Sequence, residues 1–401
     1  MKTQLLLENE KGRYERVAPP CPYFGTCGGC TLQDLCYKDQ LNFKRERLQR
    51  DLAPFETVAR IELVGLDDPW RYRNKAELTF GAFEGNMILG YHAARSFWRI
   101  VDLEDCLLLP EPLTRVMRDV RSLAAESGLS AYHPKTHQGF FRHLLVRSSR
   151  RTGKVMLGLI TAPGQREIIE SMADVLMERH QELSSIYWGI SSKIADIAIP
   201  DELFHLRGAE YLDEQMGPFH IRLHPFSFIQ PTSVQAERIY EQLCDALSWC
   251  QAGVAWDLYC GIGIIAFYLS RKVSKVYGID IEPHHLDLAR LNASANGLDN
   301  VTFYAGRVEN LLLDRNFWLK EAKPDIVVAD PPRAGLHPGA LTSLLAARPR
   351  SIAYLSCNPQ SLVRDLNELT TSFPKYRVVS IQAFDMFPQT IHLEVLAILK
   401  R

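Results

Sequence analysis

Beyond about residue 224, short apolar runs alternate with amphipathic stretches at a regular spacing. The apolar runs predict buried strands at 254–258, 275–280, 301–304, 325–330 and 351–356. The stretches around them predict helices at 232–248, up to about 270, at 283–296, at 338–347 and from Pro359. Strands that alternate with helices are typical of a Rossmann-like, doubly wound α/β domain. Two consecutive strand patterns, 377–384 and 390–399, predict an antiparallel hairpin at the edge of its sheet.

The pattern before residue 224 is different. Alternating positions predict a hairpin around Glu84-Gly85-Asn86, from strands at 71–80 and 87–91, and further strands at 139–148, 154–160, 185–190 and 219–223. Helical spacing recurs at 35–52, 111–126 and 164–180, whereas residues 1–35 are rich in Gly, Pro and Cys and predict a loop. We therefore expect a cysteine-rich segment with a helix at 1–56, a central, mostly antiparallel α+β domain at 57–223 and the α/β domain at 224–401.

Composition places the chain among ordinary globular proteins, with 46% hydrophobic and 23% charged residues in 401. No apolar run approaches the roughly 20 residues that cross a bilayer. The N-terminus becomes charged too soon for a secretory signal. We expect a cytoplasmic monomer without a membrane partner.

A net charge of -1 gives no support to nucleic-acid binding, but cations are concentrated locally. Residues 142–154 contain five cations and no acid, and 71–75 contain three cations beside Trp70 and Tyr72. Such stretches suit a phosphate backbone and stacked bases, and they are equally compatible with an ordinary solvated strand face. The central domain is therefore a candidate RNA-binding domain.

The nine cysteines are unevenly placed, and three of them form Cys21-x5-Cys27-x2-Cys30. An odd count without an export signal argues against a disulfide framework. Three thiolates in a Gly-rich loop suit an iron–sulfur cluster or zinc. The spacing leaves Cys36 and Cys106 open as the fourth ligand.

Asp257-Leu-Tyr-Cys-Gly-Ile-Gly263 lies between a predicted strand and a predicted helix. Glycines there allow a sharp turn and a close approach to a ligand at the carboxyl ends of the strands. Asp280 ends the next strand, where a carboxylate can accept both ribose hydroxyls of an adenosine. The turn alone does not decide between NAD and S-adenosylmethionine.

Two further motifs follow predicted strands. Asp330-Pro331-Pro332 forms a rigid exit that holds a carboxylate over the pocket, as enzymes that methylate a flat base require. Cys357 follows the next strand, just before a helix whose N-terminal dipole favours a thiolate. A thiolate that adds to carbon 6 of uracil makes carbon 5 nucleophilic, and a base must then remove the proton of carbon 5. Glu394 is the candidate base, because strand alternation puts it on one face with Thr390 and His392.

The motifs CPYFGTCGGC, DLYCGIG, DPPRAG, SCNP and DMFPQTIHLE, in this order, resemble the bacterial RNA (uracil-5-)-methyltransferase family. The resemblance is strongest to its iron–sulfur members that act on 23S ribosomal RNA, and it covers the chain from Cys21 onward. It implies S-adenosylmethionine-dependent methylation of carbon 5 of a uridine, with Cys357 as nucleophile and Glu394 as base. It also implies S-adenosylmethionine contacts at Gln230, Tyr259, Asp280 and Asp330, and a 4Fe-4S cluster on Cys21, Cys27, Cys30 and Cys106.

The chain departs from that family in two places. Only 20 residues precede Cys21, so we expect the N-terminal β-barrel RNA-binding domain of many relatives to be absent. Position 264 is Ile where some relatives have Asn. The competing interpretations are an amino-methyltransferase of adenine or guanine, a nicotinamide-dependent iron–sulfur oxidoreductase, and a non-enzymatic RNA-binding protein.

Overall fold

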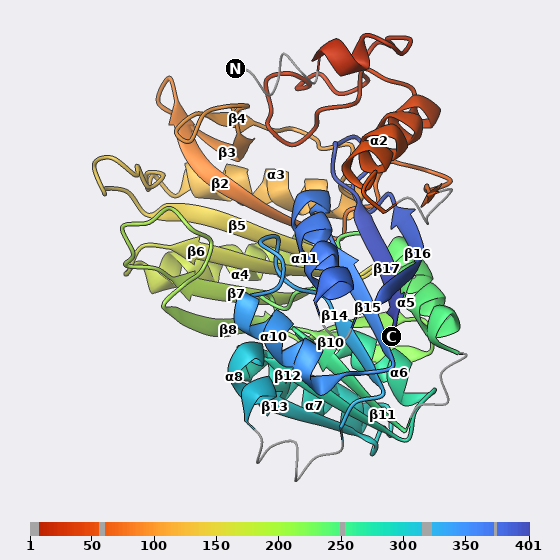
Figure 1. The fold of residues 1–401 in the computed structure, drawn as a ribbon. Coiled ribbons are helices and arrows are strands. Elements are labelled where there is room, and N and C mark those ends of the chain that lie inside the picture. The colour runs from red at the N-terminus through yellow and green to blue at the C-terminus, as the bar shows by residue number, and fades with distance from the viewer. Residues whose placement is uncertain (1–7, 56–60, 249–252, 315–322, 373–374) are drawn as a thin grey trace.

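The computed structural model describes residues 8–55, 61–248, 253–314, 323–372 and 375–401, and it contains two large sheets (Figure 1). The C-terminal sheet has eight strands in the order β1-β16-β17-β15-β14-β11-β12-β13. Its strands are β1 (Glu62–Val64), β11 (Val254–Leu258), β12 (Lys275–Asp280), β13 (Val301–Ala305), β14 (Ile326–Ala329), β15 (Ser351–Ser356), β16 (Arg377–Phe384) and β17 (Glu394–Lys400). Strands β11 to β15 are mutually parallel, which confirms the α/β sheet.

Helices cover both faces of this sheet, and each face has its own apolar core. One face packs against α5 (Ser233–Leu247), α6 (Ile264–Ser270) and α7 (Pro283–Ala295). The other packs against α2 (Tyr37–Asp51), α8 (Val308–Leu313), α10 (Pro338–Ala347) and α11 (Pro359–Thr371). All these helices except α8 were predicted from the sequence. The sheet is therefore doubly wound, and its strand ends emerge between two helical layers.

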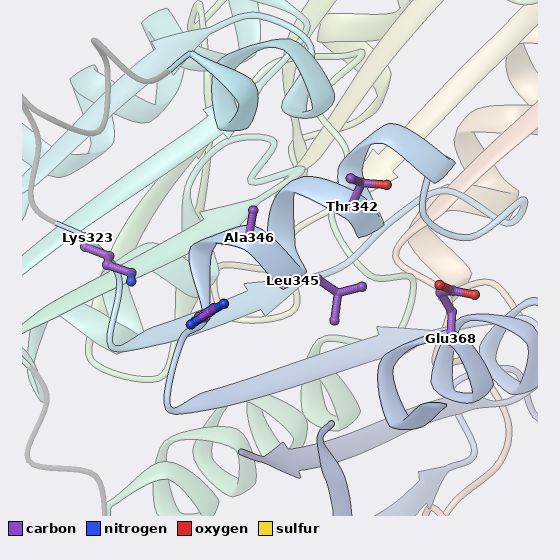
Figure 2. A pocket seen from close by; sticks show the side chains of 6 residues that line it. Lys323, Thr342, Leu345, Ala346 and Glu368 are labelled. Atoms are coloured by element: carbon purple, nitrogen blue, oxygen red, sulfur yellow. The ribbon is translucent and has the colours of Figure 1, made fainter. Parts of the chain in front are cut away.

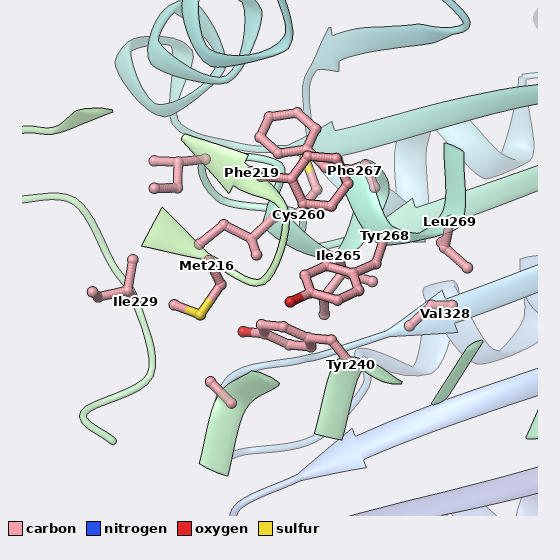
Figure 3. Packing of buried hydrophobic residues seen from close by; sticks show 14 of the residues in the cluster. Met216, Phe219, Ile229, Tyr240, Cys260, Ile265, Phe267, Tyr268, Leu269 and Val328 are labelled. Carbon is pink, nitrogen blue, oxygen red and sulfur yellow. The ribbon is translucent and has the colours of Figure 1, made fainter. Parts of the chain in front are cut away.

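Strands β9 (Leu212–Met216) and β10 (Phe219–Leu223) form a separate antiparallel hairpin that covers the first of these faces. Phe219 packs on Phe267 and Tyr268 of α6, with ring centroids 5.8 and 5.3 Å apart (Figure 3). The side chain of Asn292 on α7 accepts a hydrogen bond from the Arg222 backbone at 2.8 Å. Although we expected residues 219–223 in the central sheet, they pack on the C-terminal α/β unit.

The predicted edge hairpin exists but does not lie at the edge. Strand β16 pairs with β17 on one side and, in parallel, with β1 on the other, where Glu62 faces Gln382. Strand β17 also begins at Glu394 and not at Thr390. The Thr390 hydroxyl donates to Phe387 O at 2.8 Å and accepts from His392 N at 3.1 Å, so a local turn replaces the strand there. Strand alternation was therefore the wrong reason for selecting Glu394.

The central sheet has seven strands in the order β4-β3-β2-β5-β6-β7-β8. They are β2 (Lys75–Phe83), β3 (Asn86–His92), β4 (Ile100–Asp102), β5 (Phe141–Ser148), β6 (Val155–Thr161), β7 (Leu183–Ile190) and β8 (Glu202–Gly208). Only the β6–β7 pair is parallel in this sheet, and α3 (Glu111–Glu126) and α4 (Arg166–Arg179) pack against it. The mostly antiparallel α+β arrangement is confirmed, as is the turn at Glu84 and Gly85, both with positive φ.

The arginines of β5 do not form a phosphate-binding face. Every residue of β5 is buried, and the exposed fractions of Arg142 and Arg147 are 1% and 0%. Arg142 donates to the carbonyl oxygen of Lys193 at 2.7 Å, and Arg147 donates to that of Ser227. Because β5 is a central strand covered on both faces, its guanidinium groups bind loop carbonyls. The prediction that these two arginines contact RNA, and the alternative of a solvated face, were both wrong.

Candidate active site at the carboxyl edge of the sheet

The ends of several strands converge at one edge of the C-terminal sheet. Cys357 follows β15 and Asp330 follows β14, so both lie at the carboxyl edge of these parallel strands. Because β17 runs antiparallel to β15, its first residue, Glu394, lies at the same edge. Ser356 pairs with Val395, so continuing the register by one residue sets Cys357 opposite Glu394. The structure thus brings together three residues from three separate motifs.

Gln230 joins this group from the segment that precedes α5. Its side chain hydrogen-bonds to Asp330, and its backbone oxygen accepts from the Asn74 side chain at 2.9 Å. Asn74 also donates to the Ser233 hydroxyl at 3.2 Å, and its backbone N–H donates to Pro231 O at 2.9 Å. The start of β2 in the central sheet therefore fixes the position of Gln230 in the C-terminal site.

The glycine turn after β11 has the geometry that a bound ligand needs. Gly261 and Gly263 have φ of 52° and 85°, and Tyr259 between them and β11 also has a positive φ of 63°. A Cβ at Gly263 would lie 2.7 Å from the Phe303 ring, whereas one at Gly261 would meet no atom within 4 Å. The turn is therefore tight on its protein side and open beside Gly261, as a cofactor cradle requires.

Asp280 is held at the end of β12 by backbone donors. Its carboxylate accepts from Gly261 N and from Glu282 N, each at 2.9 Å. Burial favours the neutral form, but His285 and these N–H groups outweigh it and hold the pKa of Asp280 below its usual value. An ionised carboxylate beside the open turn retains lone pairs for ribose hydroxyls.

The candidate base, Glu394, and its neighbour Asp330 have strongly perturbed pKa values. Burial, with Asp330 nearby, raises the pKa of Glu394 well above its usual value, and burial raises that of Asp330 to about 6. Glu394 is 2% exposed, and its Oε1 has no hydrogen-bond partner among the described residues. An unpartnered buried oxygen at this edge fits a group that acts on a bound substrate.

The pKa of the Cys357 thiol differs from the expectation, because the sequence predicted a favoured thiolate. Burial, and then the charges of Glu394 and Asp330, raise the pKa of this thiol to about 11. Asn358 caps α11 by accepting from Gln360 N at 3.2 Å, so the helix does begin directly after the cysteine. Burial and two nearby carboxyl groups nevertheless outweigh the effect of the helix terminus.

Arg333 was quoted within a motif, but no role was predicted for it. It is exposed, and its charge lowers the pKa values of Cys357 and His392. Its backbone oxygen accepts from the Asn358 side chain at 2.9 Å, which ties the loop after β14 to the loop after β15. A cation directly after Asp-Pro-Pro could have been recognised as a partner for the thiolate on the neighbouring strand.

A groove of about 1150 Å³ lies at the junction of the two sheets, next to segments that flank this site. Its walls include Ser227 to Ile229 and Pro231 on either side of Gln230, and Phe387, Thr390 and His392 just before Glu394. Five cations line the groove and outnumber its three acids: Lys11, Arg16, Arg73, Lys75 and Arg95 against Glu8, Asp34 and Glu77. The groove has the size and lining to admit a polymeric, negatively charged substrate.

Another hollow, of about 640 Å³, lies between α10 and α11 (Figure 2). It is lined by Lys323, Thr342, Leu345, Ala346, Arg348 and Glu368. Both helices start near the carboxyl edge, whereas Leu345, Ala346 and Glu368 lie in their later turns and Lys323 precedes β14, so the hollow lies away from Cys357. None of the predicted site residues lines it.

The N-terminal cysteines are also brought together. Cys21, Cys27, Cys30 and Cys106 all line one small pocket, beside Arg73, whereas Cys36 is exposed elsewhere. Burial raises the pKa of the Cys30 thiol to about 12. Within the described parts of the chain, however, no three His, Cys, Asp or Glu side chains are arranged to hold a metal ion. The four thiols therefore share a pocket without the arrangement of a metal site, and the metal stays a prediction.

No helix in the described residues has the length and apolar character needed to cross a membrane.

A sequence model of the tRNA (Uracil-5-)-methyltransferase family matches residues 208–401. The chain is 33% identical over 390 residues to an uncharacterized RNA methyltransferase of Halalkalibacterium halodurans, covering 96% of this chain and 84% of the relative. It is 35% identical to one of Enterococcus faecalis over 398 residues, covering 98% and 86%.

Among solved structures, the fold resembles the tRNA (uracil-54, C5)-methyltransferase of Pyrococcus abyssi in complex with S-adenosyl-L-homocysteine. The TM-score is 0.77 at 28% identity, over 94% of this chain and 86% of the other. The family match and the relatives agree with the converging strand ends and the open glycine turn. The chain therefore belongs to the S-adenosylmethionine-dependent RNA (uracil-5-)-methyltransferase family.

Proposed function

We propose that this protein, acting as a monomer, methylates carbon 5 of a uridine in RNA through a covalent adduct with Cys357. The observation that carries the proposal is the antiparallel β15–β17 register, which sets Cys357 opposite the buried Glu394. The proposed reaction requires a thiol that reaches carbon 6 of a uracil and a carboxyl group that reaches its carbon 5.

In the proposed reaction, Cys357 forms a bond from Sγ to carbon 6, and the electron pair of the C5–C6 double bond moves into an enolate. S-adenosylmethionine, when bound against Tyr259, Asp280, Asp330 and Gln230, would supply the methyl group that carbon 5 accepts, and breaking its methyl–sulfur bond would leave S-adenosylhomocysteine. Glu394 then takes the proton from carbon 5, and the returning electron pair re-forms the double bond and expels the Cys357 thiolate. Arg333, near Cys357, favours the thiolate both before it adds to carbon 6 and when it is expelled.

Two variants test the proposal. Cys357→Ala should abolish methylation and also the adduct with 5-fluorouridine RNA, because no other group can add to carbon 6. Glu394→Gln should form adducts that persist, since carbon 5 keeps its proton. Normal turnover by Cys357→Ala would contradict the nucleophile, and rapid product release by Glu394→Gln would remove Glu394 from the base role.

The same experiments separate the competing functions. An amino-methyltransferase of adenine or guanine needs no thiol, so it forms no adduct. A nicotinamide-dependent oxidoreductase would bind NADH, whereas we expect binding of S-adenosylhomocysteine alone.

We further propose that Cys21, Cys27, Cys30 and Cys106 hold a 4Fe-4S cluster. The support is their shared pocket and the exposure of Cys36 outside it. After anaerobic reconstitution, Cys106→Ser should lose iron and sulfide, whereas Cys36→Ser should retain both. Equal iron content in the two variants would contradict this ligand set.

For the target we propose 23S ribosomal RNA, because the cysteine motif resembles that of relatives acting on it. Transfer RNA is the second candidate, favoured by the name of the matching family and by the solved Pyrococcus abyssi enzyme. Mapping 5-methyluridine in both RNAs, from cells with and without the gene, decides between them.

A further inference from the structure

The loop that joins β3 to β4, residues 93–99, has one well-defined shape. Ala93 N donates to Arg99 O at 2.7 Å and Ser96 N donates to Ala93 O at 3.0 Å. The Ser96 hydroxyl accepts from the backbone N–H groups of Trp98 and Arg99, at 3.3 and 3.0 Å. The internal hydrogen bonds leave little conformational freedom, so the side chains of the loop are presented in fixed directions.

That fixed loop exposes two large aromatic side chains. Phe97 is 84% exposed and Trp98 is 59% exposed, and Phe83 at the end of β2 is 63% exposed. Phe83, Phe97 and Trp98 line one pocket of about 590 Å³ together with Tyr132. Lys135 Nζ lies 5.2 Å from the centre of the Trp98 ring. Several exposed aromatic rings around a hollow, with a cation beside them, indicate an interaction site and not incidental exposure.

The charges around the pocket suit an anionic partner. Two acids line it, and both are engaged: Asp102 pairs with Arg121 at 2.9 Å and Asp196 with His143 at 3.0 Å. Arg95 and Arg99 of the loop are exposed. A polyanion with flat, stackable groups matches both the cations and the rings, and unpaired RNA is such a polymer.

The pocket adjoins the groove beside the candidate active site. Ala93, Ala94 and Arg95 line the groove, Phe97, Trp98 and Arg99 line the pocket, and His92 lines both. The β3–β4 loop is therefore the ridge between the two hollows. A strand whose uridine enters the groove passes over this ridge.

We propose that the β3–β4 loop, with Phe97 and Trp98 at its tip, is the docking platform for unpaired nucleotides that flank the target uridine. The rings stack on flanking bases, and Arg95 and Arg99 contact the phosphates next to them. This proposal rests on the proposed function, since it presumes that the groove receives an RNA strand.

The test is binding of the full-length protein to a single-stranded oligoribonucleotide of about 12 nucleotides, within the range that comparable platforms bind. Phe97→Ala/Trp98→Ala should weaken binding about tenfold or more, because each base stack that is removed is worth at least several-fold in affinity. Trp98→Phe keeps a ring and should retain most of the affinity. The control is Val379→Ala, an exposed apolar position on β16 that lies in neither hollow.

Arg95→Ala/Arg99→Ala should flatten the dependence of binding on salt, by about 0.7 in the log–log slope for each phosphate that the protein no longer neutralises. In both double variants, binding of S-adenosylhomocysteine should be unchanged. If the aromatic double variant binds RNA like the unmodified protein, the platform is disproved. If instead the unmodified protein binds RNA but forms no Cys357 adduct, the proposed chemistry fails while the platform stands.

Discussion

Three titratable side chains at the carboxyl edge have perturbed pKa values. Burial raises the pKa values of Cys357, Glu394 and Asp330, the charge of Asp330 adds to the shift of Glu394, and the charges of both carboxyl groups add to the shift of Cys357. The resting site therefore disfavours the thiolate that the proposed chemistry needs. Substrate binding and nearby cations must lower the pKa of the Cys357 thiol during the reaction. The protonation of this thiol therefore determines how the reaction depends on pH.

We expect adduct formation with 5-fluorouridine RNA to accelerate as pH rises. A thiol whose pKa is about 11 is mostly protonated at neutral pH. Its thiolate fraction grows about tenfold per pH unit below that value. Single-turnover rates measured from pH 6 to 9 check this, and a rate that falls with rising pH would contradict it.

Arg333→Ala should move that pH profile to higher pH, because the cation that it removes is the one that lowers the pKa of Cys357. Arg333→Lys keeps the charge and should largely restore the profile. The same single-turnover assay compares the three proteins. Superimposed profiles for Arg333→Ala and the unmodified protein would show that Arg333 does not act on the thiol.

Among the secondary-structure elements, α2 holds the segment that leads to the proposed base. Lys44 on α2 pairs with Asp385 at 2.6 Å, with both side chains fully buried, and donates to Phe387 O at 3.0 Å. Gln40 donates to the Gln389 side chain at 2.8 Å and accepts from Gln389 N at 3.0 Å. Residues 385–389 thus depend on a helix more than 300 positions earlier in the chain.

Lys44→Ala should destabilise the protein by about 3–5 kcal/mol, because it leaves the buried Asp385 side chain without its cationic partner. Replacing both members, as Lys44→Met/Asp385→Leu, should be far less costly. The matched control is Arg166→Ala, which breaks an exposed pair with Glu170 and should cost at most about 1 kcal/mol. Urea unfolding measures all three, and equal losses for Lys44→Ala and Arg166→Ala would disprove the argument.

The regular elements could be predicted from the sequence because their apolar positions repeat within each segment. Strands such as β15 and helices such as α5 need only local spacing. Strand β1 could not be predicted: it has three residues, and its partner β16 lies some 300 positions away. The burial of Arg142 was missed for a related reason. A buried cation on a central strand can be recognised only when its carbonyl partners are known, and Lys193 lies far along the chain.

The candidate site was predicted unevenly. Cys357 and Asp330 follow apolar strands, so the edge they share is encoded locally. Glu394 reaches that edge because β17 pairs with β15 as well as with β16; the hairpin was predicted from the sequence, but its insertion next to β15 was not. Cys106 lines the pocket with the three N-terminal cysteines, although only a resemblance distinguished it from Cys36. The catalytic and ligand roles of all these residues stay predictions.

Across the whole molecule, the cysteine-rich segment connects the two sheets. Thr31 N and Leu32 N donate to Gln389 O at 2.9 and 3.0 Å, beside the candidate active site. Gly28 N donates to His92 O at 3.0 Å, and Ala94 N donates to Thr26 O at 2.8 Å, beside the β3–β4 loop. One short segment therefore fixes both the loop before Glu394 and the proposed RNA platform.

Removal of the proposed cluster by a chelator and an oxidant should accordingly weaken RNA binding and methylation together. Binding of S-adenosylhomocysteine should persist, because the glycine turn is held by β12 of its own sheet, through Gly261 N to Asp280 and Cys260 N to Ile279 O. Parallel titrations with RNA and with S-adenosylhomocysteine measure the two affinities before and after the treatment. An equal loss of both affinities would indicate general unfolding instead.

The most direct measurement is peptide mapping of the complex formed with S-adenosylmethionine and 5-fluorouridine RNA. We predict that the nucleotide is attached to Cys357 and carries one added methyl group. The buried Cys260 of the glycine turn provides the internal control, since its thiol pKa is raised well above the usual value. Attachment at any residue other than Cys357, or a methylated product formed without attachment, would contradict the account.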